Sequence, residues 1–236
     1  MLQIKEAFDA VGVSCSPEMA RQLEQYMEGV LSWNEKVNLT AITDRDEFTI
    51  KHLLDSVLCC GFPEYQSANK IIDVGTGGGF PGVPLAVVSP EKQFVLMDSL
   101  KKRLNIIDEL TSSIGIRNVS TVHARAEELA RNKAHREKYD LCVSRAVANL
   151  ATLSEYCLPF IRQGGYLFAY KGPDAEEEID QAKKAIFLLG GQLERVESAP
   201  LNRYGLDHRI LFIKKIRNTP AKYPRKAGTP SKDPLK

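Results

Sequence analysis

Four of the five residues in Gly75–Gly79 are glycine, and they follow a short apolar run, Lys70–Val74, that contains one carboxylate, Asp73. Glycine lets the backbone adopt positive φ values and approach a bound molecule closely. Pro81 and Pro84 then open an apolar segment that can start a helix, because proline in the first turn costs no hydrogen bond. This succession of strand, glycine turn and helix predicts a nucleotide-type binding site in an open α/β sheet.

Two classes of ligand fit the glycine turn. The spacing Gly77-x-Gly79-x-x-Gly82 also satisfies the dinucleotide fingerprint. However, Asp73 would repel the pyrophosphate of a dinucleotide, whereas S-adenosylmethionine has no phosphate and carries a sulfonium and an ammonium that a carboxylate attracts. No Gly-Lys-Ser/Thr follows the glycines, which excludes a P-loop. We therefore expect S-adenosylmethionine as cofactor, with an NAD-dependent oxidoreductase as the alternative.

The elements after the glycine turn continue to alternate between strand and helix. Further strands are expected at Gln93–Met97, Asn118–His123, Tyr139–Ser144 and Gly164–Lys171. Asp98 ends the first of these, where a βαβ unit places a carboxylate for ribose hydroxyls, and both cofactors need that carboxylate. Because ligands bind at the carboxyl ends of parallel strands, we expect charged side chains to converge there: Asp73, Asp98, Glu127 and Arg145.

Two final strands, Gln192–Ser198 and Arg209–Lys215, are joined without room for a full helix. They predict an antiparallel hairpin at the edge of an otherwise parallel sheet. A dehydrogenase would more usually continue with further strand and helix units, so the hairpin favours a methyltransferase.

The first 66 residues read as a helical extension. Ser16 and Pro17 form a good helix start, and apolar residues follow at helical spacing. Polar residues then stand among apolar ones in Trp33–Thr43, and His52 and Ser56 are four positions apart on one helix face. For any one of these polar residues, helix capping or a buried contact is the simpler interpretation.

The composition limits the remaining possibilities. With 236 residues and 43% hydrophobic residues, the chain can form one sizeable domain with an appendage. It has no run of about 18 apolar residues, so we expect no membrane span. The five cysteines lack metal-ligand or redox spacing, which predicts no metal site and suits a reducing cytoplasm.

The last residues are strongly basic. Residues 214–236 carry a net charge of +7, whereas the whole chain carries only +2. Four prolines and the absence of hydrophobic periodicity predict a segment that is disordered or loosely attached until it meets a polyanion. Tyr223 beside Arg225 and Lys226 is typical of single-stranded RNA binding, and a solubilising tail is the alternative.

Taken together, the motifs resemble a known family. In order along the chain they are WNEKVNLTAIT, KHLLDS, DVGTGGGFPGVPLA, MDSLKKR, ARAEE, SRAVANL, YKG, HRILFIKK and YPRKAGTPSKDPL. Nearly the whole chain resembles the bacterial small-subunit ribosomal RNA guanine-N7 methyltransferases, also called glucose-inhibited division protein B. The resemblance implies an α/β class I (Rossmann-like) methyltransferase fold with a seven-stranded, mainly parallel sheet and an antiparallel C-terminal hairpin. We expect a helical extension at 1–66, a methyltransferase domain at 67–216 and a basic Pro-rich tail at 217–236.

The resemblance also implies site residues. Cofactor contacts are expected at Gly75, Phe80, Ala126, Glu127 and Arg145, to which the residue pattern adds Asp73, Gly77 and Asp98. On the substrate side the candidates are Asn38, His52, Arg125, Arg145 and Lys171.

The implied substrate is one guanine of 16S ribosomal RNA, in the conserved loop near the decoding site of the small subunit. Guanine N7 has a lone pair and no proton, so its methylation needs no general base, and Arg145 and Lys171 are expected to be anchors rather than acids. We expect a cytoplasmic enzyme whose partner is the small ribosomal subunit, with no DNA or membrane partner. A non-catalytic RNA-binding protein of ribosome assembly is the second alternative, suggested by the basic tail.

Overall fold

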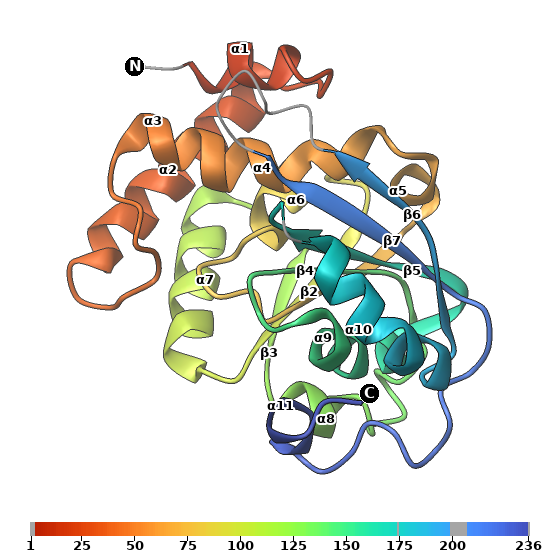
Figure 1. The fold of residues 1–236 in the computed structure, drawn as a ribbon. Helices are drawn as coiled ribbons and strands as arrows, with labels where there is room; N and C mark the ends of the chain where they lie inside the picture. Colours follow the sequence, from red (N-terminus) through yellow and green to blue (C-terminus); the bar gives the residue numbers. More distant parts are fainter. Residues whose placement is uncertain (1–2, 174, 199–206, 236) are drawn as a thin grey trace.

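A single seven-stranded sheet forms the centre of the computed structural model, which describes residues 3–173, 175–198 and 207–235 (Figure 1). The strand order is β3-β2-β1-β4-β5-β7-β6. Strands β1 to β5 pair in parallel, and β7 runs antiparallel to both β5 and β6. The strands are β1 (Lys70–Val74), β2 (Gln93–Asp98), β3 (Val119–His123), β4 (Tyr139–Arg145), β5 (Ile161–Lys171), β6 (Gly191–Ser198) and β7 (Arg209–Lys215). The predicted fold class, including the closing hairpin, is confirmed.

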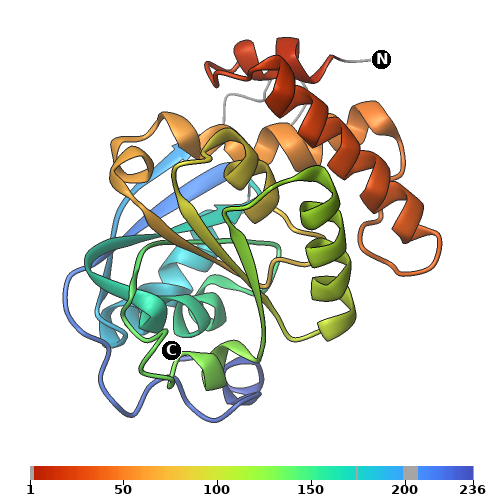
Figure 2. The ribbon, with the colours of Figure 1, turned by 180° about the vertical axis from the view of Figure 1, so that it is seen from behind.

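Helices cover both faces of this sheet (Figures 1 and 2). Successive strand residues point to opposite faces, so Ile71 of β1 belongs to one apolar cluster and Ile72 to the other. The first cluster includes residues of α6 (Gly82–Val88) and α7 (Lys101–Ile114). The second includes residues of α8 (Ala126–Leu129), α9 (Leu150–Cys157) and α10 (Ala175–Leu188), with a short 3-10 turn, η3 (Leu158–Phe160), after α9.

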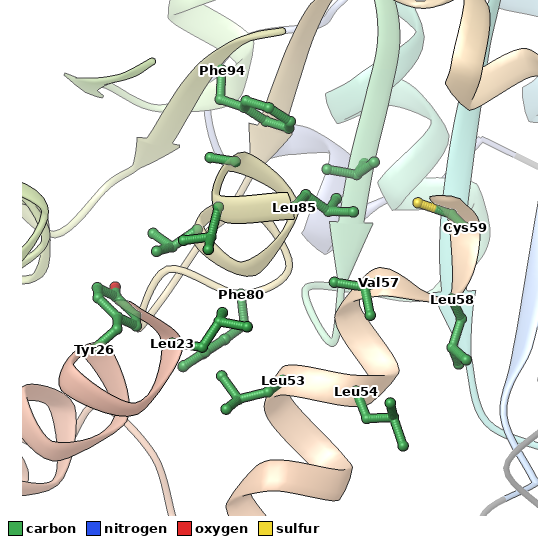
Figure 3. Packing of buried hydrophobic residues seen from close by; sticks show 14 of the residues in the cluster. Leu23, Tyr26, Leu53, Leu54, Val57, Leu58, Cys59, Phe80, Leu85 and Phe94 are labelled. Carbon is green, nitrogen blue, oxygen red and sulfur yellow. The ribbon is translucent and has the colours of Figure 1, made fainter. Parts of the chain in front are cut away.

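The N-terminal extension packs on the α6 side of the sheet. Figure 3 shows Leu23 and Tyr26 of α2 and Leu53 near α6, and all three are fully buried. The predicted helix start is confirmed, because the Ser16 side chain accepts a hydrogen bond from the Met19 N–H at 3.2 Å. The elements are α1 (Ile4–Asp9), α2 (Pro17–Asn34), α3 (Arg45–Phe48), the π-helix η1 (Thr49–Leu54), α4 (Asp55–Val57), the 3-10 turn η2 (Leu58–Gly61) and α5 (Pro63–Ser67).

The two ends of α7 are held by different groups. Gly115 ends the helix with a φ of 82°, as expected for a C-terminal glycine. At the other end Leu100 occupies the N-cap position, and its side chain makes no capping hydrogen bond. Asp98 holds this start from the end of β2, because its Oδ1 accepts the Leu100 N–H at 2.8 Å.

The expectation of a disordered tail is also wrong. Residues 217–235, which we call the C-terminal strap, pack against the body and include α11 (Thr229–Lys232). Arg136 donates to the carbonyl oxygens of Thr219 and Tyr223 at 2.8 and 2.9 Å, and the Tyr223 side chain is buried. These backbone contacts stabilise the strap, although its sequence has no hydrophobic periodicity.

Candidate active site

The glycine turn lies directly after β1 and bends back toward β2. The N–H groups of Gly75 and Thr76 donate to the Met97 carbonyl at 2.9 and 3.0 Å, and Thr76 O accepts from Gly79 and Phe80. Gly79 has a φ of +90°, and a Cβ there would lie 2.1 Å from the Tyr26 hydroxyl oxygen. Tyr26 in turn donates to Gly78 O at 2.9 Å, so α2 holds the turn from the side of the extension.

Asp73 lies behind this turn and not in front of it. Its Oδ2 accepts hydrogen bonds from the Thr76 hydroxyl at 2.7 Å and the Gly82 N–H at 2.9 Å. Burial raises the pKa of this carboxyl to about 7, although both hydrogen bonds and Arg145 oppose the shift. Within the described ranges Oδ1 has no hydrogen-bond partner. The carboxyl therefore ties β1 to the start of α6, which differs from the ligand-facing position inferred from the sequence.

A pocket of about 290 Å³ opens beside the turn, at the carboxyl ends of β1 and β2. It brings together five of the predicted site residues: Gly75, Asp98, Arg125, Ala126 and Glu127. The buried Asp98 carboxylate accepts the Gly77 N–H at 3.0 Å through Oδ2. Leu100 and Val147 supply apolar surface, and each is more than a third exposed.

The far wall of the pocket comes from α8 and α9. Glu127 is only 4% exposed, and its Oε1 accepts the N–H of Gly228 at 2.8 Å. Tyr156 of α9 also lines this wall, a residue that sequence reasoning missed because nothing in its neighbourhood marks it. Arg125 precedes α8 and its side chain is exposed.

Arg145 lies in a second, adjacent group of polar residues. Its guanidinium donates to Asp55 Oδ2 at 2.6 Å, to the Lys51 carbonyl at 2.8 Å and to His52 Nδ1 at 3.1 Å. Burial would raise the pKa of Asp55, but the hydrogen bond from His208 and the charge of Arg145 lower it below its ordinary value. Asp55 and His208 were not predicted as site residues, although both stand in motifs that the sequence singles out.

His52 is held as a neutral ring in this group. Burial lowers its pKa to about 3, and the positive charge of Arg145 acts in the same direction. Because Nδ1 accepts from Arg145, Nε2 carries the proton and donates to the Thr40 hydroxyl at 2.6 Å. The ring also stacks on Phe80, with centroids 4.6 Å apart, so the glycine turn and the Arg145 group contact each other.

The two remaining substrate-side candidates lie outside both groups. Asn38 is exposed. The hydrogen bonds of this loop are made by Asn34 instead, whose Oδ1 accepts from the N–H groups of Leu39 and Thr40. Lys171 donates to the Ala148 carbonyl at 2.7 Å and to Glu178 at 2.6 Å. Since Glu178 also accepts the N–H of Leu150, Lys171 holds the loop between β4 and α9.

Two features are absent from the described ranges. No group of three or more His, Cys, Asp or Glu side chains there could hold a metal ion. Nor does that part of the chain contain a helix long and apolar enough to cross a membrane.

The fold is shared with solved structures of distant sequence. One is the O-methyltransferase from Bacillus cereus in complex with SAH, which is 18% identical, with a TM-score of 0.55 over 80% of this chain and 90% of that chain. Another is NSun6 from Pyrococcus horikoshii, which is 16% identical, with a TM-score of 0.56 over 76% of this chain and 57% of that chain. At these identities the likeness concerns the fold alone.

Sequence comparison gives the family. Residues 19–205 match the family model described as "GidB: rRNA small subunit methyltransferase G". Ribosomal RNA small subunit methyltransferase G from Clostridium novyi is 50% identical over 97% of this chain and 94% of its own length. The protein of the same name from Clostridium tetani is 44% identical over 99% of this chain and 98% of its own length. The chain therefore belongs to the rRNA small subunit methyltransferase G family, which confirms the predicted S-adenosylmethionine-dependent methyltransferase of small-subunit ribosomal RNA.

Proposed function

We propose that the pocket between the ends of β1 and β2 and the N-terminal end of α8 binds S-adenosylmethionine, and that the acceptor is N7 of a guanine in 16S ribosomal RNA. In this pose Asp98 accepts the ribose hydroxyls and Leu100 contacts the purine face. Glu127 uses Oε1 for the strap, so Oε2 is the oxygen that accepts from the cofactor.

One observation carries the choice of cofactor. The N–H groups of the glycine turn that a pyrophosphate would need are already engaged by the protein itself. Those of Gly75 and Thr76 donate to Met97 O, and that of Gly77 donates to the Asp98 carboxylate. A phosphate at this place would meet a carboxylate instead of free donors, which disfavours a dinucleotide and suits a cofactor without phosphate.

The surrounding charges suit an acceptor that becomes cationic. Guanine N7 has a lone pair and no proton, so its methylation is an in-line displacement at the sulfonium methyl and needs no general base. The two cations expected to anchor the acceptor are paired, Arg145 with Asp55 and Lys171 with Glu178. The wall beyond β4 and β5 therefore adds little positive charge, and positioning of the two reactants can supply up to about 7–11 kcal/mol of the acceleration.

We assign roles to the substrate-side residues accordingly. The exposed side chains of Asn38 and Arg125 are free to contact RNA. His52, Arg145 and Lys171 instead bind other protein groups and so hold the segments that surround the acceptor. The guanine must leave its stack, which costs a few kcal/mol and least in a loop. Because the substrate is the bacterial small subunit, we place the reaction in the cytoplasm, without a DNA or membrane partner.

Calorimetric titration with S-adenosylmethionine and with NADH tests this proposal. We expect binding of S-adenosylmethionine alone, and loss of that binding in Gly77→Asp, where a new carboxylate would stand beside Asp98. Gly12→Asp is the matched control, because Gly12 also has a positive φ (+75°) and free space around its Cβ but lies outside the pocket. Binding of NADH in the wild type would overturn the assignment.

A further inference from the structure

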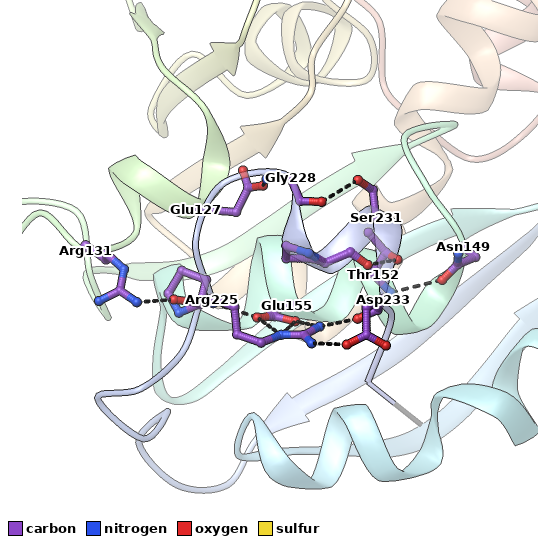
Figure 4. Close-up of polar contacts among 11 residues, drawn as sticks. Glu127, Arg131, Asn149, Thr152, Glu155, Arg225, Gly228, Ser231 and Asp233 are labelled. Atoms are coloured by element: carbon purple, nitrogen blue, oxygen red, sulfur yellow. Dashed lines mark hydrogen bonds and ion pairs between the residues drawn. The ribbon is translucent and has the colours of Figure 1, made fainter.

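The C-terminal strap runs from the end of β7 to the helices that form the far wall of the pocket (Figures 1 and 4). Arg136 and Arg131 hold its first half by donating to backbone carbonyls, including Pro224 O at 2.5 Å from Arg131. In its second half, Thr152 of α9 donates to Pro230 O at 2.9 Å. The strap is therefore attached both to the loop after α8 and to α9.

One ion pair anchors the strap to α9. The Glu155 carboxylate has no exposed surface, and Arg225 donates to it from Nε, Nη2 and the backbone N–H at 2.7–3.1 Å. Arg225 also donates to the Asp233 carbonyl at 2.7 Å, which closes the strap on itself. A buried carboxylate left without its cation is strongly unfavourable, so docking of the strap and folding of α9 depend on each other.

The strap contacts two residues that line the cofactor pocket. Gly228, which has a φ of +81°, donates its N–H to Glu127 Oε1 at 2.8 Å. Burial raises the pKa of the Tyr156 phenol, Glu127 raises it further, and a hydrogen bond with Ser231 of the strap lowers it. Glu127 and Tyr156 both line the pocket, and they come from different helices. The strap contacts both of them, through Gly228 and Ser231.

We infer that the C-terminal strap is a positioning element of the cofactor pocket. The ion pair of Arg225 with Glu155 holds Gly228 in contact with Glu127, and it holds Ser231 in contact with Tyr156. This inference rests on the proposed placement of the cofactor. It gives the basic C-terminal segment a role apart from RNA binding. Because cofactor binding and strap docking favour the same arrangement, each strengthens the other by the same factor.

The test compares variants of the full-length protein. Arg225→Gln removes the anchor, and Lys226→Gln is the matched control, because it makes the same charge change at the next, exposed residue. We expect Arg225→Gln to raise the Kd for S-adenosylmethionine about 10-fold or more, Arg225→Lys to rescue part of the loss, and Lys226→Gln to leave the Kd unchanged. Ser231→Ala, at an exposed position, should raise the Kd without lowering the melting temperature, which covers the case in which Arg225→Gln fails to fold.

A double-mutant cycle separates positioning from general destabilisation. If the strap acts through Glu127, Arg225→Gln should add little to the Kd of Glu127→Gln. S-adenosylmethionine should also protect the wild-type strap from trypsin, with slower cleavage at Lys222 and Lys226. Folded Arg225→Gln and Ser231→Ala variants with the wild-type Kd would overturn the inference while leaving the proposed function intact. A wild-type protein that binds no S-adenosylmethionine would instead contradict the proposed function itself.

Discussion

The backbone N–H of Gly77 donates to Oδ2 of Asp98 at 3.0 Å, and Oδ1 of the same carboxylate accepts the Leu100 N–H at 2.8 Å. One side chain at the end of β2 thus fixes both the glycine turn after β1 and the start of the segment that leads into α7. The same carboxylate lines the pocket. Protein geometry and cofactor recognition therefore depend on one residue.

Asp98→Asn should weaken the binding of S-adenosylmethionine. An amide has one oxygen in place of two, so one of the two backbone donors loses its acceptor and the ribose loses a charged one. We expect the Kd for S-adenosylmethionine to rise about 10-fold to 100-fold, as the loss of a charged hydrogen bond suggests. Asp108→Asn is the control, because Asp108 is an exposed residue of α7 that binds Thr121 outside the pocket. Equal cofactor affinity in the two variants would contradict this role of Asp98.

Asp73→Asn tests whether Asp73 ties β1 to α6 or instead attracts the cofactor with its charge. Because the folded pKa of about 7 lies above the ordinary value of 3.8, the native carboxyl holds its proton more tightly than the unfolded one. The Asp73 carboxyl therefore makes the free energy of unfolding fall as the pH rises from about 4 to about 7, and its effect then levels off. Asp73→Asn should remove this slope in urea unfolding and keep the wild-type Kd for S-adenosylmethionine. A large loss of cofactor affinity would show that the carboxylate attracts the ligand, as the sequence argument held.

Arg145→Met should destabilise the protein substantially. It leaves the fully buried Asp55 carboxylate without its nearest cation, and breaking a buried pair costs about 3–5 kcal/mol. Lys183→Met, which removes an exposed pair with Asp180, should cost about 0–1 kcal/mol. Urea unfolding of both variants measures the difference. Similar unfolding free energies would mean that the Arg145 pair is not a structural anchor of this wall.

The exposed lysines of the strap remain candidates for contact with RNA. Lys222, Lys226 and Lys232 are exposed, and changing all three to Gln should reduce the slope of log K against log salt by about 2 if each contacts a phosphate. The Kd for S-adenosylmethionine should not change. An unaltered salt dependence of RNA binding would exclude a phosphate-binding role for these residues.

The sequence could predict those parts of the site that follow from local patterns. The glycine turn, Asp98 at a strand end and Glu127 at the next junction lie where parallel βαβ units place them, and the structure brings Asp98 and Glu127 into one pocket. Even here a strand end does not determine which way a side chain points. Asp73 stands at the predicted position, but its carboxyl faces Thr76 and Gly82.

The contacts that sequence reasoning missed join residues far apart in the chain. Arg145 pairs with Asp55 across 90 positions, and Arg225 pairs with Glu155 across 70. Each charged residue has several possible partners of opposite sign, and no periodicity selects one of them. For the same reason the sequence predicts a disordered tail, because it shows neither partners for these cations nor hydrophobic periodicity.

Transfer of tritiated methyl from S-adenosylmethionine to small ribosomal subunits tests the account most directly. The subunits should come from cells that lack this enzyme, and the labelled base should be mapped. We predict label at a single N7-methylguanine of 16S ribosomal RNA, abolished in Gly77→Asp and retained in Gly12→Asp. Label on another atom or base would contradict the proposed acceptor. Binding of the cofactor without any labelled RNA would contradict the account of the acceptor side as a whole.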